Sequence, residues 1–212
     1  MRNTESRGVI KKRNSNNRTR NNVFLLACEG DNKTEKNYFQ CFNSDNVKIR
    51  FVPGNETDPE NMMMNLIDKY EEYDLDPCDG NLGFCLVDSD FDERKDNQLK
   101  KAEILSKDCD GVSLIVSSPC FEIWFLCHFI FSTKQYRHYK EVEKDTKQYI
   151  KDYTKESKNV YDTIKDKTDK AINNAKKLEQ VALDDGKVMH TVSFMPSTEV
   201  YKIIDVIKNS KS

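Results

Sequence analysis

The fold is decided by residues 82–90, which read LGFCLVDSD. A short apolar run bounded by polar, Gly-containing sequence has the pattern of a buried strand. Residues 23–30, VFLLACEG, have the same character. Each run ends in acid, with Glu29 after the first and Asp88 and Asp90 after the second. If the two strands are neighbours, these carboxylates converge at the carboxyl edge of a parallel sheet, where open α/β sheets place their sites.

A cluster of carboxylates is expected to hold a divalent cation, because unpaired negative charges repel one another. Ligands that are all oxygen suit Mg²⁺ or Mn²⁺ rather than zinc. Asp88 and Asp90 are two residues apart, so in an extended segment both face the same side and reach one ion. The alternative for this Asp-Ser-Asp segment is an ordinary turn after a strand. Glu29 is the third expected ligand, or a general base or acid.

The rest of the first half alternates between strand-like and helix-like patterns. Helical spacing of apolar residues follows Thr34, which is expected to cap a helix that reaches Phe42. Pro59 is expected to open a second helix, as proline does at a first helical position. This alternation predicts an α/β fold with a parallel sheet flanked by helices. The expected strands are 23–28, 47–52, 82–87 and 112–116, and the third helix is 97–107.

Two further acids are candidates for the same site. Glu35 is either a first-turn residue favoured by the helix dipole or an acid that completes a second metal position. Residues 120–131 are apolar throughout and predict a helix buried on every side. Glu122 within that run is costly unless it is paired, so it is either catalytic or bridged to Arg137. His128 in the same run is either a core residue or a catalyst.

The charge is unevenly distributed. Residues 1–22 carry seven basic residues and one Glu, a net charge of +6, whereas the chain as a whole carries −2 and the remainder therefore −8. A basic arm on an acidic body indicates contact with nucleic-acid phosphates, although an arm without aromatic residues also fits a solubilising tail. The candidate phosphate contacts are Arg13, Arg18, Arg20 and Lys33.

Three regions follow from these patterns. They are a basic arm over 1–21, an α/β core over 22–132, and a helical insert with a C-terminal helix over 133–212. The last helix is expected to follow Pro196–Thr198.

Cysteine usage and hydropathy indicate the compartment. The seven cysteines form no CxxC pair and several lie in apolar runs, which argues against a disulfide framework and a zinc site. Neither a signal peptide nor an apolar run long enough to cross a bilayer is visible, so we expect a cytoplasmic protein without membrane contact. The motifs of P-loop nucleotide hydrolases, dinucleotide enzymes, zinc peptidases and serine hydrolases are also missing from the sequence.

At four segments the chain resembles the RloB-like family, whose catalytic part has the Toprim fold shared with topoisomerases, bacterial primases and OLD-family nucleases. The segments are CEGDNKTEKNYF (28–39), VDSD (87–90), SPCFEIW (118–124) and PSTEV (196–200). The family usually has an Arg-like residue near its aspartates, whereas Ser89 stands between them here. A direct phosphate contact from that position is therefore not expected.

The resemblance implies a Mg²⁺- or Mn²⁺-dependent nuclease that hydrolyses phosphodiester bonds in RNA, such as transfer RNA, or in DNA. It further implies a role in bacterial anti-phage defence, by abortive infection, with another defence protein or a second copy of the chain as partner. Glu29, Asp88, Asp90 and Glu122 would be the catalytic residues. The alternatives are a non-catalytic sensor that binds a nucleotide or metal, and a primase-like nucleotidyl transferase.

Overall fold

The computed structural model describes residues 21–30 and 33–210. Its sheet is built of β1 (Asn22–Cys28), β2 (Val47–Phe51), β3 (Leu82–Asp88), β4 (Val112–Ser118) and β5 (Ser197–Thr198). The helices are α1 (Lys33–Phe39), α2 (Pro59–Glu72), α3 (Arg94–Lys107), α4 (Glu122–Cys127), α5 (Tyr139–Tyr149), α6 (Val160–Ile164), α7 (Thr168–Asp184) and α8 (Val200–Ser210). Four 3-10 turns are Gln40–Phe42, Pro77–Asp79, Lys165–Lys167 and Val192–Phe194.

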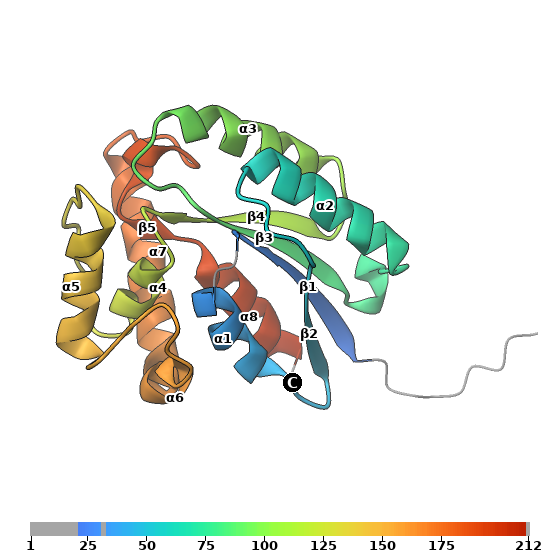
Figure 1. Ribbon diagram of the computed structural model, residues 1–212, viewed down its shortest axis with the longest axis horizontal. Coiled ribbons are helices and arrows are strands. Elements are labelled where there is room, and N and C mark those ends of the chain that lie inside the picture. Colours follow the sequence, from blue (N-terminus) through green and yellow to red (C-terminus); the bar gives the residue numbers. More distant parts are fainter. Residues whose placement is uncertain (1–20, 31–32, 211–212) are drawn as a thin grey trace, which may run out of the picture.

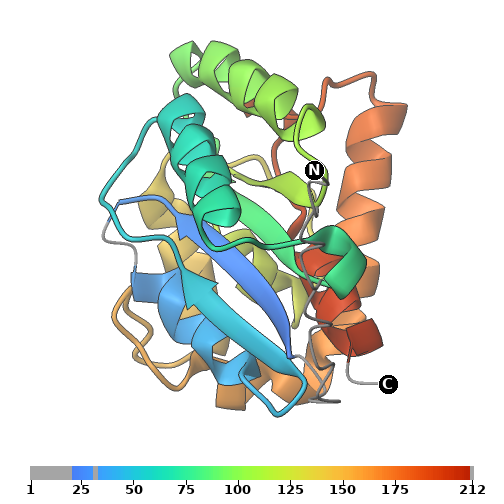
Figure 2. The ribbon, with the colours of Figure 1, turned by 90° about the vertical axis from the view of Figure 1, so that its right-hand side faces the viewer.

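The sheet confirms the expected α/β class. The strand order is β2-β1-β3-β4-β5, and all pairs are parallel except β4 with β5. Helices cover both faces: α2 and α3 lie on one, and α1, α4 and α8 lie on the other (Figure 1). The view in Figure 2 shows β2 along one edge of the sheet. The order makes β1 and β3 direct neighbours, as the position of the acidic residues requires.

Strand alternation divides the core into two layers. Leu25 and Ala27 face the layer with α2 and α3, whereas Phe24 and Leu26 face the larger layer with α1, α4, α7 and α8. Successive side chains of a strand point to opposite faces, so each central strand supplies both layers. The methionine-rich stripe of α2 is core, because Met62 and Met63 are almost completely buried.

Several boundaries differ from the sequence expectations. Thr34 lies inside α1, and its hydroxyl donates to the backbone carbonyl of Lys155 at 3.0 Å, so it is not the cap of that helix. The buried helix expected over 120–131 is only α4, although its six residues are all buried as expected. Ser197 and Thr198 form β5 beside β4, so the C-terminal region contributes a strand to the same sheet.

Other expectations about the chain are confirmed. All seven cysteines lie in the described part of the chain, and none of them forms a disulfide. Within the described residues, no helix is long and apolar enough to span a membrane. The helix expected after Pro196–Thr198 is α8.

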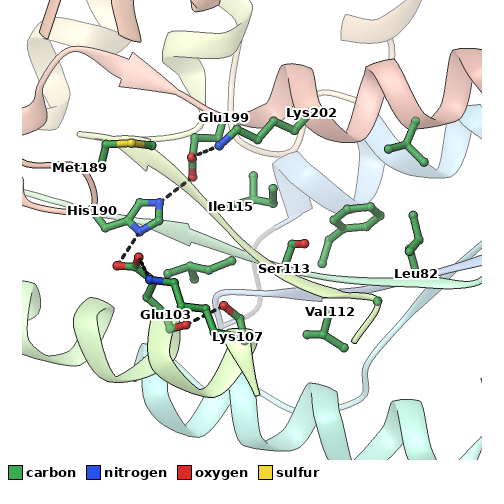
Figure 3. Close-up of a pocket in the computed structure, with 15 residues that line it drawn as sticks. Leu82, Glu103, Lys107, Val112, Ser113, Ile115, Met189, His190, Glu199 and Lys202 are labelled. Carbon is green, nitrogen blue, oxygen red and sulfur yellow. Dashed lines mark hydrogen bonds and ion pairs between the residues drawn. The ribbon is translucent and has the colours of Figure 1, made fainter. Parts of the chain in front are cut away.

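His190 connects α3 to the segment that enters α8. Its Nε2 lies 3.0 Å from Oε2 of Glu199, and its Nδ1 lies 3.2 Å from Oε2 of Glu103, an ion-pair distance without good hydrogen-bond alignment. Lys202 contacts the other oxygen of Glu199 (Figure 3). These residues border a cavity of about 460 Å³ along the edge of β4, away from the acidic strand ends. The sequence offered no context for His190.

Burial would lower the pKa of His190, but the contacts with Glu199 and Glu103 outweigh it and the pKa is raised. The charged imidazole therefore stabilises the fold fully below its unfolded pKa of about 6.5, and this contribution is lost as the pH rises through the higher folded pKa.

We predict that His190→Gln lowers the free energy of unfolding by roughly 1–3 kcal/mol near pH 6, the value of a hydrogen bond to a charged group. The deficit should shrink above the folded pKa. Urea unfolding of both proteins at several pH values between about 5.5 and about 9 measures this deficit. His138→Gln is the control, because His138 is exposed and its nearest carboxylate, that of Glu141, is 3.9 Å away, too far for a hydrogen bond. A deficit that is the same at every pH would contradict the charged bridge.

Candidate metal centre at the strand ends

The carboxyl ends of β1 and β3 lie side by side. Cys28 pairs with Leu86 in the parallel register, so Glu29 leaves β1 next to the end of β3. The backbone N–H of Asp88 donates to Oε2 of Glu29 over a long 3.4 Å. The structure thus brings together the acidic residues of two segments that are 59 positions apart.

The strand alternation nevertheless separates these acids. Asp88 continues the row of Phe84 and Leu86, whose side chains belong to the layer with α1 and α4. Glu29 continues the row of Leu25 and Ala27, whose layer contains α3. The two carboxylates therefore begin on opposite faces of the sheet and meet only at its rim.

Asp90 departs from the extended geometry expected for it. Its φ is +55°, in the left-handed region, so the chain turns directly after β3 and Asp88 and Asp90 do not present their side chains as a strand would. The turn is fixed by the N–H of Asp90, which donates to the carbonyl of Pro119 at 2.9 Å. As a result, the Asp90 carboxylate shares a lysine contact with Glu29 and not with Asp88.

On the other face, Asp88 lies within electrostatic reach of Glu35 and Glu122. Glu35 comes from the first turn of α1 and is 3% exposed, and Glu122 opens α4 and is 1% exposed. The hydroxyls of Tyr139 and Tyr153 both donate to Oε1 of Glu122, at 3.0 and 2.7 Å. These tyrosines take the place expected for Arg137, whose backbone N–H donates to Glu141 instead.

Burial raises the pKa values of Asp88 and Glu35 within this group, and the repulsion between its carboxylates raises them further. Burial, followed by the charges of Glu35 and Glu122, raises the pKa of Asp88 well above its usual range. Burial raises the pKa of Glu35 to about 8, and the charge of Glu122 adds to the effect. Carboxyl groups that resist ionisation in this way cluster at functional sites.

A lysine that the sequence analysis did not select joins the other two acids. The Nζ of Lys95 lies 3.0 and 3.1 Å from the two carboxylate oxygens of Glu29 and 2.6 Å from Oδ2 of Asp90. Burial of Lys95 acts to lower its pKa, but Glu29 and Asp90 outweigh this and the pKa is raised. The Glu29 carboxyl has a raised pKa because burial exceeds the opposing effect of Lys95.

A second unexpected lysine, Lys155, approaches from the segment between α5 and α6. Its ammonium lies 4.3 Å from the ring centroid of Tyr139. Burial of the ammonium acts to lower the pKa of Lys155, but Glu122 and Asp88 raise it above the usual value. Lys155 is thus a cation of the surface whose ammonium lies close enough to Glu122 and Asp88 to be affected by their charge.

Two other expected residues, Lys33 and His128, make contacts outside the acidic group. Lys33 forms an exposed ion pair with Glu156 at 2.7 Å. His128 is a core residue, since it is fully buried with Nδ1 2.9 Å from the carbonyl of Trp124, and burial lowers its pKa to about 4. Arg13, Arg18 and Arg20 lie outside the described residues.

The donor set fits Mg²⁺ or Mn²⁺, since every candidate ligand is a carboxylate oxygen and Asp88 has four other carboxylates within electrostatic reach. Among residues 21–30 and 33–210, however, no three His, Cys, Asp or Glu side chains are already arranged around one point. The reason is visible in the geometry: alternation splits Asp88 from Glu29, and Lys95 occupies the space between Glu29 and Asp90.

The amino-acid sequence matches the model of one protein family. The model of the family described as RloB-like protein matches residues 24–207, which is nearly the whole described structure. The chain belongs to the RloB-like family. The match extends from β1 to α8 and so includes both strand ends, α4 and the segment that carries Lys155. Neither a curated protein nor a solved structure matches the chain.

We predict that Glu35→Gln stabilises the metal-free protein in a pH-dependent way. The wild-type carboxyl has a folded pKa of about 8 against about 4.3 unfolded, so ionisation increasingly opposes folding as the pH rises between these values. The glutamine lacks this penalty, and its advantage should reach the order of a few kcal/mol at pH 8 and vanish near pH 4.

Thermal melts in EDTA across this range measure the effect. Glu72→Gln, an exposed substitution on α2, is the control and should give no such trend. A Glu35→Gln variant that melts below the wild type at pH 8 would show that this carboxylate is stabilised, not repelled, by its surroundings.

Proposed function

We propose that this RloB-like protein is a metal-dependent nuclease, which cleaves phosphodiester bonds in RNA, such as transfer RNA, or in DNA. The observation that carries the proposal is the gathering of five carboxylates at one end of the sheet. Asp88 lies in electrostatic contact with Glu29, Glu35, Asp90 and Glu122. A protein retains such mutually repelling groups at a cost in stability, which is the pattern of a functional site.

In this proposal Asp88 and Glu29 hold one Mg²⁺ or Mn²⁺ with Asp90, and Glu35 and Glu122 provide a second position. A bound ion of this kind stabilises charge on the phosphate and lowers the pKa of an attacking water. Tyr139 and Tyr153 fix the orientation of Glu122 through their two hydrogen bonds to one oxygen. Lys155 would attract the phosphate, since it is a surface cation within electrostatic reach of Glu122 and Asp88.

Membership of the RloB-like family supports the wider proposal, through the resemblance set out above. It comprises a Toprim-type catalytic core, a cytoplasmic setting and a role in anti-phage defence by abortive infection. A homodimer or a complex with another defence protein fits that role, as does the basic arm for drawing in the nucleic acid.

We predict that Asp88→Asn abolishes cleavage, with a loss of at least about 10²-fold, because it removes the ligand at the centre of the acidic group. The assay incubates wild type and variant with total transfer RNA, single-stranded DNA and duplex DNA, in Mg²⁺, Mn²⁺ or EDTA. Cleavage by the wild type should require the metal, and the substrate that is cut identifies the class.

The matched control is Asp92→Asn, four residues further on, where the carboxylate faces solvent and pairs with Arg94 at 2.7 Å. It should retain wild-type rates. Full activity of Asp88→Asn would disprove the assigned centre. Tight binding of nucleic acid without turnover of any substrate would instead favour the sensor alternative.

The proposed role of the arm has a separate test. Replacing Arg13, Arg18 and Arg20 by alanine should weaken substrate binding and leave the turnover of bound substrate unchanged. Each lost phosphate contact should reduce the slope of log affinity against log salt by about 0.7–0.9. Measuring KM and kcat between low and physiological salt gives both quantities.

The control removes three ion-paired lysines of α2 and α3, the half-buried Lys69 and the exposed Lys101 and Lys107, and so makes the same change in net charge. If the two triple variants lose affinity equally, the arm acts only through net charge and makes no contact of its own.

A further inference from the structure

Lys95 lies where a cation is expected. Its ammonium touches both oxygens of Glu29 and one oxygen of Asp90, within 3.1 Å. The side chain is 9% exposed, against 17% for Glu29 and 53% for Asp90. The amino group therefore reaches the two acids from inside the protein. Of the three side chains, that of Asp90 is the most exposed to solvent.

Helix preferences do not account for this position. Lys95 is the second residue of α3, where the partial positive charge of the helix N-terminus disfavours a cation. The neighbouring Arg94 is 91% exposed and pairs with Asp92 in the solvent. Lys95 alone is turned inward, so its attraction to Glu29 and Asp90 has to exceed both the unfavourable dipole and the loss of hydration.

We propose that Lys95 is an internal counter-cation that competes with the divalent metal for Glu29 and Asp90, and thereby sets the metal affinity of the site. The inference rests on the proposed function, because it concerns the same carboxylates. A divalent ion and an ammonium cannot share the same few oxygens, since like charges at this separation repel. Metal binding therefore requires the Lys95 ammonium to leave Glu29 and Asp90.

Removal of the ammonium should have a definite sign. With a neutral side chain at this position, Glu29 and Asp90 lose their compensating charge while Asp88, Glu35 and Glu122 remain close by. The negative potential at the site increases, and the affinity for a divalent cation rises with it. A lysine whose only role was structural would give the opposite result, because its loss would loosen the carboxylates.

The experiment titrates the full-length protein with Mn²⁺ and follows free Mn²⁺ by electron paramagnetic resonance, without nucleic acid. The variants are Lys95→Met, which keeps the length of the side chain, and Lys95→Gln, which keeps a hydrogen-bond donor. Lys101→Met is the control, since Lys101 lies on the same helix and pairs with Glu60 at the surface. Circular dichroism confirms the fold of each variant.

We expect both Lys95 variants to bind Mn²⁺ about 10-fold more tightly than the wild type or more, and Lys101→Met to match the wild type. Equal or weaker binding by folded Lys95 variants, beside a wild type that binds, would overturn the inference and leave the proposed metal centre standing. A failure of every protein to bind Mn²⁺ at millimolar concentration would overturn both.

A measurement on the wild type keeps the inference testable if both variants fail to fold. Brief acetylation followed by mass spectrometry reports the accessibility of each lysine. Saturating Mn²⁺ should increase the modification of Lys95 several-fold relative to Lys101, because the displaced ammonium becomes accessible. Unchanged modification of Lys95 under Mn²⁺ would contradict displacement.

Discussion

The main constraint on this structure is the repulsion between carboxylates that lie at the carboxyl ends of two neighbouring parallel strands. The surrounding residues have to compensate these charges. β1 and β3 pair directly, so Glu29 and Asp88 lie at the same end of the sheet within electrostatic reach of each other. α1 and α4 add Glu35 and Glu122 from the layer that covers one face. Buried like charges oppose folding unless they are protonated or compensated. The negative charge is compensated differently on the two faces of the sheet. The ammonium of Lys95 does so on one face, and the hydroxyls of Tyr139 and Tyr153 donate hydrogen bonds on the other.

The helices are positioned accordingly. α3 presents Lys95 to the acids from its first turn, and its residue Glu103 is joined through His190 to Glu199 at the entrance of α8. The segment between α5 and α6 brings Tyr153 and Lys155 to the other side, where Thr34 of α1 donates to the Lys155 carbonyl. Contacts between segments distant in sequence thus hold α3 on one side of the sheet and the segment of Tyr153 and Lys155 on the other.

The sequence predicted the parts of this arrangement that follow from local pattern. Apolar runs that end in Glu29 and Asp88 identified two strands, and their adjacency brought the acids together as expected. Lys95 was missed because its partner Glu29 is 66 residues away and a lysine in a first helical turn suggests nothing unusual. The same holds for Tyr153 and Glu122, 31 residues apart. The turn at Asp90 was missed because its left-handed φ depends on the carbonyl of Pro119, which only the folded chain supplies.

The separation of the acids also limits how the metal of the proposed function would be bound. Asp88 is the last residue of β3 and Glu29 directly follows β1, and both strands are paired and buried on both faces, so the backbone at these positions is fixed. The groups that can yield are side chains: the Lys95 ammonium, and the carboxylates of Glu29 and Asp90, which are the more exposed acids. Asp90 itself has the left-handed conformation, which costs an L-residue roughly 1–2 kcal/mol, and the hydrogen bond from its N–H to the carbonyl of Pro119 holds this turn. Assembly of the centre is therefore expected to proceed by exchange of cations on a fixed backbone, which requires no movement of the sheet.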